Sequence, residues 1–287
     1  MAGRIVVGID GSEQSAAALE WAVARALLGD DELELVNTYN LVVQMDFFGY
    51  QGMSGQQVDW IVDLSKRLLE AAEARVRELA PDLACTARSV SGHPAPTLVA
   101  ASQGAVALVV GRRGLGGAAS ALLGSVSNRI TVEAGCPVVV VGEGRVPTTG
   151  PIVVGVDGSE FGLHALRYAV AEASLRGTTV RAIAAYDVLH PALGADDELV
   201  ARMRAGVDAE TTDTISRALG DVDVAVEKIA VEGPAAEAIL DHARDAQLVV
   251  VGTHGKGLVR RVLLGSVSRA VLNDAERPVA VVDMPAT

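Results

Sequence analysis

The chain has 287 residues, half of them hydrophobic and 3% aromatic, with a formal net charge of −12 and a pI near 4.9. The length suggests about two domains, and the apolar composition excludes an intrinsically disordered chain. The acidic balance argues against nucleic-acid binding, which needs a basic footprint, and no apolar run is long enough to span a membrane.

The first residues and the two cysteines bear on location and chemistry. Met1–Arg4 lead at once into a strand-like run with no signal-peptide features, so we expect a cytoplasmic protein. Cys85 and Cys136 have neither metal-ligand nor redox spacing, and we expect both to be buried apolar residues. We therefore predict no protein-borne metal site.

Apolar runs alternate with helical patterns along the first half. The predicted strands cover residues 5–9, 33–38, 84–90, 106–110 and 138–141, and the predicted helices cover 14–28, 58–80, 94–103 and 125–134. A long connection at 40–57 carries Met45, Phe47, Phe48 and Tyr50 between glycines. Connections of that length are often functional, and this one either covers the ligand site locally or docks a partner.

The second half repeats the first. Ile5–Glu13 read IVVGIDGSE and Ile152–Glu160 read IVVGVDGSE, while Gly111–Ser127 and Gly252–Ser268 both end in LLGSVS. The second half opens with a strand at 152–156 and closes with one at 279–282. We predict two domains, 1–143 and 150–287, joined by a Gly-, Pro- and Thr-rich linker near 142–150.

Short apolar strands alternating with helices predict an α/β fold. Right-handed crossovers build open parallel sheets with helices on both faces, here two in tandem. Such sheets bind ligands beyond the carboxyl ends of their strands, where the strand order reverses.

Asp10 and Asp157 follow the first strand of each half, and Ser12 and Ser159 stand two residues later. Carboxylates there can accept hydrogen bonds from ribose hydroxyls. The alternative is that these residues cap the next helix, an interpretation we favour for the serines.

A glycine pattern follows the fourth strand of each half. Gly111-x2-Gly114-x9-Gly124-Ser125 recurs as Gly252-x2-Gly255-x9-Gly265-Ser266. Glycines admit close approach of a ligand to the backbone, and the helix amino terminus that follows attracts phosphate. A Gly-rich loop capped by serine is the structural alternative, but identical spacing in two copies favours phosphate binding. The Walker pattern of P-loop NTPases is absent from the sequence.

The aspartate and the glycine pattern together resemble the ATP-binding branch of the universal stress protein family, over essentially the whole chain as two fused copies. The resemblance implies a Rossmann-like five-stranded sheet in order 3-2-1-4-5 in each half, with one ATP, accompanied by Mg²⁺, in each. It implies that Asp10 and Asp157 hold ribose and that backbone near Thr38 and Ala185 reads adenine. The phosphate-binding positions that it implies are Gly111, Gly114, Gly124, Ser125 and Val126 in the first half, and Gly252, Gly255, Gly265, Ser266 and Val267 in the second. It also implies that the last strands pair as an internal pseudo-dimer.

The two loops differ in their side chains. Arg112 and Arg113 correspond to Thr253 and His254, and the second loop also carries Lys256, Arg260 and Arg261. These side chains either contact phosphate or are solvated at the surface, so the two sites can differ in affinity.

The five histidines, His93, His164, His190, His242 and His254, form no acid–base or metal-binding pair, and no residue stands out as a catalytic base. We expect packing or surface roles for His93, His164 and His242. We predict a nucleotide-dependent regulator or sensor of stress and growth state rather than a fast enzyme. The alternatives are an interaction module of the same fold that binds no nucleotide, and a slow ATPase. An unidentified protein partner and a further homodimer are compatible with the sequence.

Overall fold

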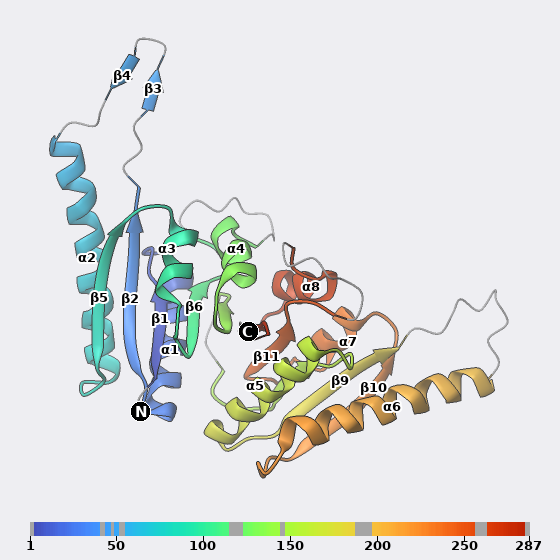
Figure 1. Ribbon diagram of the computed structural model, residues 1–287. Coiled ribbons are helices and arrows are strands. Elements are labelled where there is room, and N and C mark those ends of the chain that lie inside the picture. Colours follow the sequence, from blue (N-terminus) through green and yellow to red (C-terminus); the bar gives the residue numbers. More distant parts are fainter. Residues whose placement is uncertain are drawn as a thin grey trace.

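A computed structural model describes residues 3–40, 44–46, 49–51, 55–114, 123–143, 147–186, 197–255 and 263–284 (Figure 1). The elements of the first half are β1 (Arg4–Gly8), α1 (Glu13–Gly29), β2 (Glu32–Tyr39), β3 (Gln44–Asp46), β4 (Gly49–Gln51), α2 (Gly55–Leu79), β5 (Cys85–Ser91), α3 (Pro94–Ala101), β6 (Ala107–Gly111), α4 (Ser125–Glu133) and β7 (Val138–Val141). The predicted strands and helices of this half are confirmed to within three residues at each end.

The second half has the same plan. Its elements are β8 (Ile152–Gly155), α5 (Glu160–Arg176), β9 (Val180–Tyr186), α6 (Asp197–Leu219), β10 (Val226–Glu232), α7 (Ala235–Asp241), β11 (Leu248–Gly252), α8 (Ser266–Asp274) and β12 (Val279–Val282). The hairpin β3–β4 in the long connection of the first half was not predicted, because strands of three residues are too short to show an alternating pattern. Phe47 and Phe48 lie outside the described residues.

The strand order in each half is 3-2-1-4-5, as predicted: β5-β2-β1-β6-β7 and β10-β9-β8-β11-β12. The two five-stranded units do not form separate sheets. β7 and β12 pair antiparallel, with Val140 opposite Val279 and Val138 opposite Val281, so that one ten-stranded sheet runs through the molecule. The predicted pairing of the last strands is therefore confirmed, and it removes two exposed edges.

Each face of this sheet carries one core that extends across both halves. Helices α1, α2, α5 and α6 cover one face, and α3, α4, α7 and α8 cover the other. Along β7 the side chains alternate between the two cores: Val139 and Val141 face the first, Val138 and Val140 the second. All four are buried, as expected for parallel strands covered on both sides.

A buried ion network joins the two halves beneath the β7–β12 pair. The Arg25 side chain of α1 donates from Nε to Oε1 of Glu172 in α5 at 2.6 Å and from Nη1 to Asp31 at 2.9 Å. Arg176 donates to the other oxygen of Glu172 at 3.0 Å and lies over the ring of Trp21. The pKa of Arg25 is raised on balance. Burial alone would lower it, but the negative charge and hydrogen bond of Glu172, together with the charges of the other partners, have the larger combined effect.

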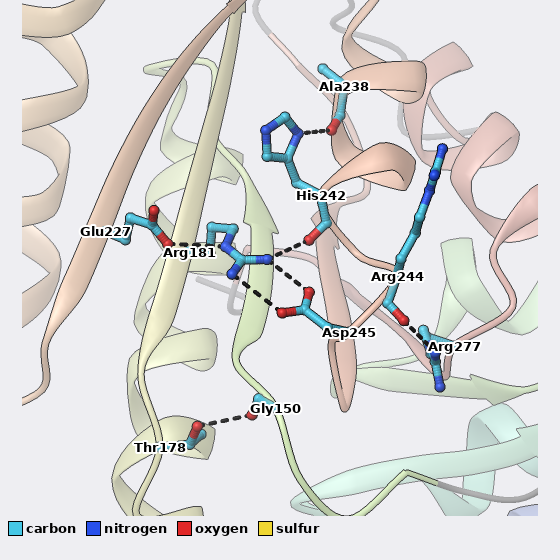
Figure 2. A network of polar contacts seen from close by, with 9 residues as sticks. All are labelled: Gly150, Thr178, Arg181, Glu227, Ala238, His242, Arg244, Asp245 and Arg277. Carbon is cyan, nitrogen blue, oxygen red and sulfur yellow. Dashed lines mark hydrogen bonds and ion pairs between the residues drawn. The ribbon is translucent and has the colours of Figure 1, made fainter.

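Gly150 marks the entry of the chain into the second half (Figure 2). Its carbonyl accepts a hydrogen bond from Thr178 Oγ1 at 2.9 Å, and its φ is +109°. A β-carbon at this position would stand 1.9 Å from the carbonyl oxygen of Asp245. Nearby, Arg181 holds the turn after α7 by donating to the Asp245 carboxylate and to the carbonyl of His242, each at 2.8 Å. Only glycine fits at position 150.

Candidate functional site

A pocket of about 230 Å³ lies at the carboxyl ends of β8, β9 and β11 in the second half. It stands where β8 and β11 adjoin, which is the switch in strand order that the sheet topology predicts as a ligand site. All seven residues that the sequence singled out in this half line it: Asp157, Ala185, Gly252, Gly255, Gly265, Ser266 and Val267. The fold thus brings together residues that are up to 110 positions apart in the chain.

Asp157 is held from two sides. Its Oδ1 accepts hydrogen bonds from the backbone N–H of Ser159 at 3.0 Å and from the Ser159 hydroxyl at 2.6 Å. Its Oδ2 lies against Gly255, where a β-carbon would come within 2.6 Å. Ser159 is the N-cap of α5 and accepts from Gly162 N at 3.0 Å, so the predicted capping role of this serine is confirmed.

The first half repeats this arrangement. Oδ1 of Asp10 accepts from Ser12 N at 3.0 Å and from Ser12 Oγ at 2.6 Å, and Ser12 is the N-cap of α1. A β-carbon at Gly114 would stand 2.3 Å from Oδ2 of Asp10. The aspartate and the glycine loop are therefore in direct contact in both halves.

The glycine loops are closed by backbone hydrogen bonds. Gly124 N donates to Arg112 O at 3.0 Å, and Gly265 N donates to Thr253 O at 2.9 Å. The hydroxyl of Ser127 donates to Gly111 O at 2.9 Å, and that of Ser268 to Gly252 O at 2.6 Å. These bonds fix the amino termini of α4 and α8 beside the ends of β6 and β11.

The amino termini of α4 and α8 carry no side-chain cap. Gly124 and Gly265 are the N-cap residues, and as glycines they make no side-chain capping hydrogen bond to the first N–H groups of these helices. The serine-capped alternative for these loops is thus wrong, because Ser125 and Ser266 are already the first helical residues. Open N–H groups at a helix start favour anions.

The remaining predicted positions lie at the same edge of the sheet. Thr38 and Ala185 are the last residues but one of β2 and β9, and both are half-buried. Val126 and Val267 pack against the core shared by α3, α4, α7 and α8.

The two loops are supported by different side chains. In the first half Gln14 accepts from Arg113 N at 2.7 Å and donates to Glu143 at 2.8 Å. In the second half Phe161 takes the place of Gln14, and its ring centroid lies 5.2 Å from that of His254. His254 is 7% exposed and lines the pocket, whereas Thr253 donates to Asp283 at 2.9 Å. His254 is thus the loop side chain placed to meet a ligand of the second site.

The Arg112 side chain forms its hydrogen bonds with the second half of the molecule. Its guanidinium reaches the second half and donates from Nη1 to Asn273 O at 3.3 Å and from Nη2 to Ala275 O. Burial lowers the pKa of Arg112, and the nearby charge of Arg113 adds to the effect. Both arginines line a separate cavity of about 380 Å³ between the halves. Lys256, Arg260 and Arg261 lie outside the described residues.

Several pocket residues were not predicted. Gly155 ends β8 and Val156 follows it, while Gly162 lies in α5. Ile183, Ala235, Ile239 and Val251 come from other elements. The signal for Ala235 was present in the repeat, since Gly233-Pro234-Ala235 stands where the first half has Gly92-His93-Pro94. Ile183 and Ile239 read as ordinary core residues from the sequence alone.

Metal-binding clusters and membrane-spanning helices are both absent from the described part of the chain. No group of three metal-ligating side chains occurs there, and no helix there is long and apolar enough to cross a membrane. His242 makes a hydrogen bond through Nδ1 to Ala238 O at 2.8 Å, in keeping with its predicted packing role.

Comparison with known proteins agrees with these features. The model of the universal stress protein family matches residues 1–142 and 148–283. Universal stress proteins Rv1996 and Rv2005c of Mycobacterium tuberculosis are each 33% identical to this chain, the first over 98% of this chain and 95% of its own length, the second over 96% of both. The crystal structure of a universal stress protein from Archaeoglobus fulgidus DSM 4304 superimposes with a TM-score of 0.70 at 21% identity and covers 99% of this chain and 97% of that one. The chain belongs to the universal stress protein family, as two copies of its domain in tandem.

Proposed function

We propose that each half of this universal stress protein binds one adenine nucleotide, ATP with Mg²⁺, and that occupancy makes the protein a regulator of stress and growth state in the cytoplasm. The observation that carries the proposal is the pocket of about 230 Å³ in the second half, which all seven predicted residues line. The domains are proposed to divide near residues 143 and 150, and a protein partner reads the bound state.

The polar end of the pocket suits the ribose and phosphates. Asp157 is a carboxylate at the mouth of the pocket, positioned by Ser159, and supplies charge-assisted acceptors for ribose hydroxyls. The uncapped start of α8 at Gly265 and Ser266 supplies N–H donors and a positive dipole end for phosphate.

Magnesium fits this site as a companion of the nucleotide. The described residues contain no cluster of three protein ligands, so phosphate oxygens would provide most of its coordination. The hydroxyl of Ser266, or of Ser125 in the first half, is the protein ligand at hand. When bound, the ion neutralises phosphate charge.

The other end of the pocket is apolar. Ile183, Ile239 and Val251 are nearly fully buried and line it together with the half-buried Ala185. Such a surface accepts the faces of a purine, while the backbone at Ala185 is placed to read its edge. The pocket therefore has the polarity of an adenine nucleotide from one end to the other.

The energetic consequence of binding is large enough for regulation. At millimolar ATP and micromolar affinity, each occupied site adds roughly 3–4 kcal/mol of stability. If only one of two conformations binds the nucleotide, a difference of that size changes the ratio of the two conformations by roughly 10²- to 10³-fold.

The test is acid release of bound small molecules from freshly purified protein, followed by mass analysis and by calorimetric titration with Mg-ATP. We expect two adenine nucleotides per chain, and one in Asp10→Ala or Asp157→Ala. A protein that is empty and fails to bind added Mg-ATP contradicts the proposal and favours the interaction module. Phosphate release faster than about one per second would instead favour an enzyme.

A further inference from the structure

The loop of the first candidate site is bonded to a helix of the second. Arg112 follows Gly111 and donates to the carbonyls of Asn273 and Ala275, at the carboxyl end of α8. Leu123 precedes Gly124, and its N–H donates to Oδ1 of Asn273 at 3.1 Å. Both flanks of the first glycine loop are thus attached to one point of the other half.

The other end of that helix belongs to the second site. Gly265 and Ser266 at the start of α8 line the second pocket, while Asn273 and Ala275 mark its end. A helix of nine residues spans roughly 13 Å. Because α8 packs in the core through Val271 and Leu272, a shift of its end is carried to its start.

The contacts of Arg112 are those of a cation seated on a helix terminus. Among the described residues Arg112 forms no ion pair with a carboxylate, although the charges of Asp274 and Glu143 act on it, and its Nε has no hydrogen-bond partner. Its hydrogen bonds go to carbonyls at the end of α8, where the helix dipole is negative. The arginine is therefore held by α8 itself.

Comparison of the two repeats shows that the contact from the glycine loop of the first half to α8 has no counterpart at the equivalent positions of the second half. Thr253 stands at the position of Arg112 and bonds to Asp283 within its own half, and Val132 stands at the position of Asn273. A threonine side chain is too short to reach the end of α4, and valine offers no acceptor. Within the described residues the second loop has no equivalent hold on α4.

We infer that Arg112 is a positioning residue that couples the two nucleotide sites through α8, so that filling the first site tightens binding at the second. The inference rests on the proposed nucleotide binding. Ligand in the first site fixes the described residues Arg112 and Leu123, these two residues hold the end of α8, and the second site then binds at a smaller entropic cost. Linkage requires the reverse effect to be equal, and we expect about fivefold or more in affinity.

The experiment isolates the first site. In an Asp157→Ala background, shown by titration to bind one Mg-ATP per chain, amide hydrogen exchange of α4 and α8 is followed with and without Mg-ATP. We expect both helices to gain protection. Adding Arg112→Thr, which installs the residue of the other half, should abolish the gain in α8 and leave that in α4, and Arg112→Lys should restore part of it.

Two further variants serve as a second test and as a control. Asn273→Val removes only the acceptor for Leu123 and should weaken the response of α8, which keeps the test open if Arg112→Thr folds poorly. Arg129→Thr removes an exposed arginine of α4 and should change neither helix. A response of α8 that survives Arg112→Thr, or a response of α4 without α8 in the Asp157→Ala background, overturns the coupling. Binding of Mg-ATP with no response in either helix also overturns the coupling, whereas a titration in which the Asp157→Ala protein binds no Mg-ATP overturns nucleotide binding at the first site.

Discussion

Asp10 and Gly114 are in contact in the first half, with the carboxylate Oδ2 only 2.3 Å from where a β-carbon of residue 114 would lie. From the sequence, Gly114 is expected to let phosphate come close to the backbone. In the structure a side chain at position 114 would also displace the aspartate, whose other oxygen is anchored by Ser12.

The first prediction follows from that contact. Gly114→Ala should weaken nucleotide binding at the first site by about tenfold or more, because charge-assisted hydrogen bonds from ribose to Asp10 are misplaced. Gly255→Ala should do the same at the second site. At Gly124 the nearest atom to a new β-carbon is Arg112 O at 3.2 Å, so Gly124→Ala should weaken binding less than about threefold. Calorimetry of single-site variants measures this, and equal losses at 114 and 124 would contradict it.

The second prediction concerns the start of the second half. Gly150→Ala should lower the free energy of unfolding by about 3 kcal/mol or more, since the new β-carbon clashes with Asp245 O at a positive φ. Gly206→Ala in α6 is the matched control, with nothing within 4 Å of its β-carbon, and should raise stability by about 0.5–1 kcal/mol. Urea unfolding of both variants gives the comparison. A neutral effect at 150 would refute the close approach.

The third prediction concerns the ion network between the halves. Glu172→Gln leaves Arg25 and Arg176 without their shared carboxylate in a buried site and should cost about 3 kcal/mol in unfolding free energy. Glu20→Gln removes one of the two partners of Arg75 at the surface and leaves Glu78; the Arg75 and Glu20 side chains are nearly half exposed, and the change should cost less than about 1 kcal/mol. Similar decreases in unfolding free energy in the two variants would show that burial does not determine how much an ion pair contributes to stability.

The fourth prediction concerns the thiols. Burial raises the pKa of Cys85 and of Cys136 to about 11, from 9.0. Because the folded state holds these protons more tightly, their contribution to stability is complete below pH 9 and is lost as the pH rises to 11. The Cys85→Ala/Cys136→Ala protein should therefore lose less stability than the parent over that window. Unfolding midpoints at pH 9 and pH 11 decide the matter, and parallel losses would count against it.

Thiol reactivity gives an independent check on the same residues. At pH 8 about one thiol in a thousand is ionised at such a pKa, so alkylation of the native protein should be slow and should accelerate on unfolding. Cys136 is buried, whereas Cys85 is half-buried and the expectation of burial was wrong for it. Rapid native labelling of Cys136 would contradict its burial.

The fold and much of the candidate site could be predicted because their signals are local or repeated. Apolar runs such as Val138–Val141 marked strands, and two copies of one glycine spacing marked the loops. The contacts of Arg112 could not be predicted, because its partners lie 161 and 163 positions away and no periodic pattern relates them. The contact between Phe161 and His254 was missed for the same reason.

Residues of the pocket wall were missed for another reason. Ile183 and Ile239 are apolar residues in regular elements, and nothing in the sequence separates a core residue that lines a pocket from one that does not. Only the packing of β9 against α7 decides which of them faces the cavity. The pattern of apolar runs in each half indicates a separate sheet, and only the family resemblance implied that the closing strands pair and join the two.

The antiparallel pair of β7 and β12 has a consequence for how the two halves can differ. In a symmetric dimer of two identical single-domain chains paired in this way, each residue occurs once in each subunit. An arginine in the glycine loop of one subunit would then also be present in the loop of the other. Because the two halves belong to one chain, they can differ in sequence like the subunits of a heterodimer, yet they need no recognition step and do not dissociate on dilution. Arg112 faces Asn273 while Thr253 and Val132 hold the mirrored positions, a division of labour that a symmetric assembly cannot encode.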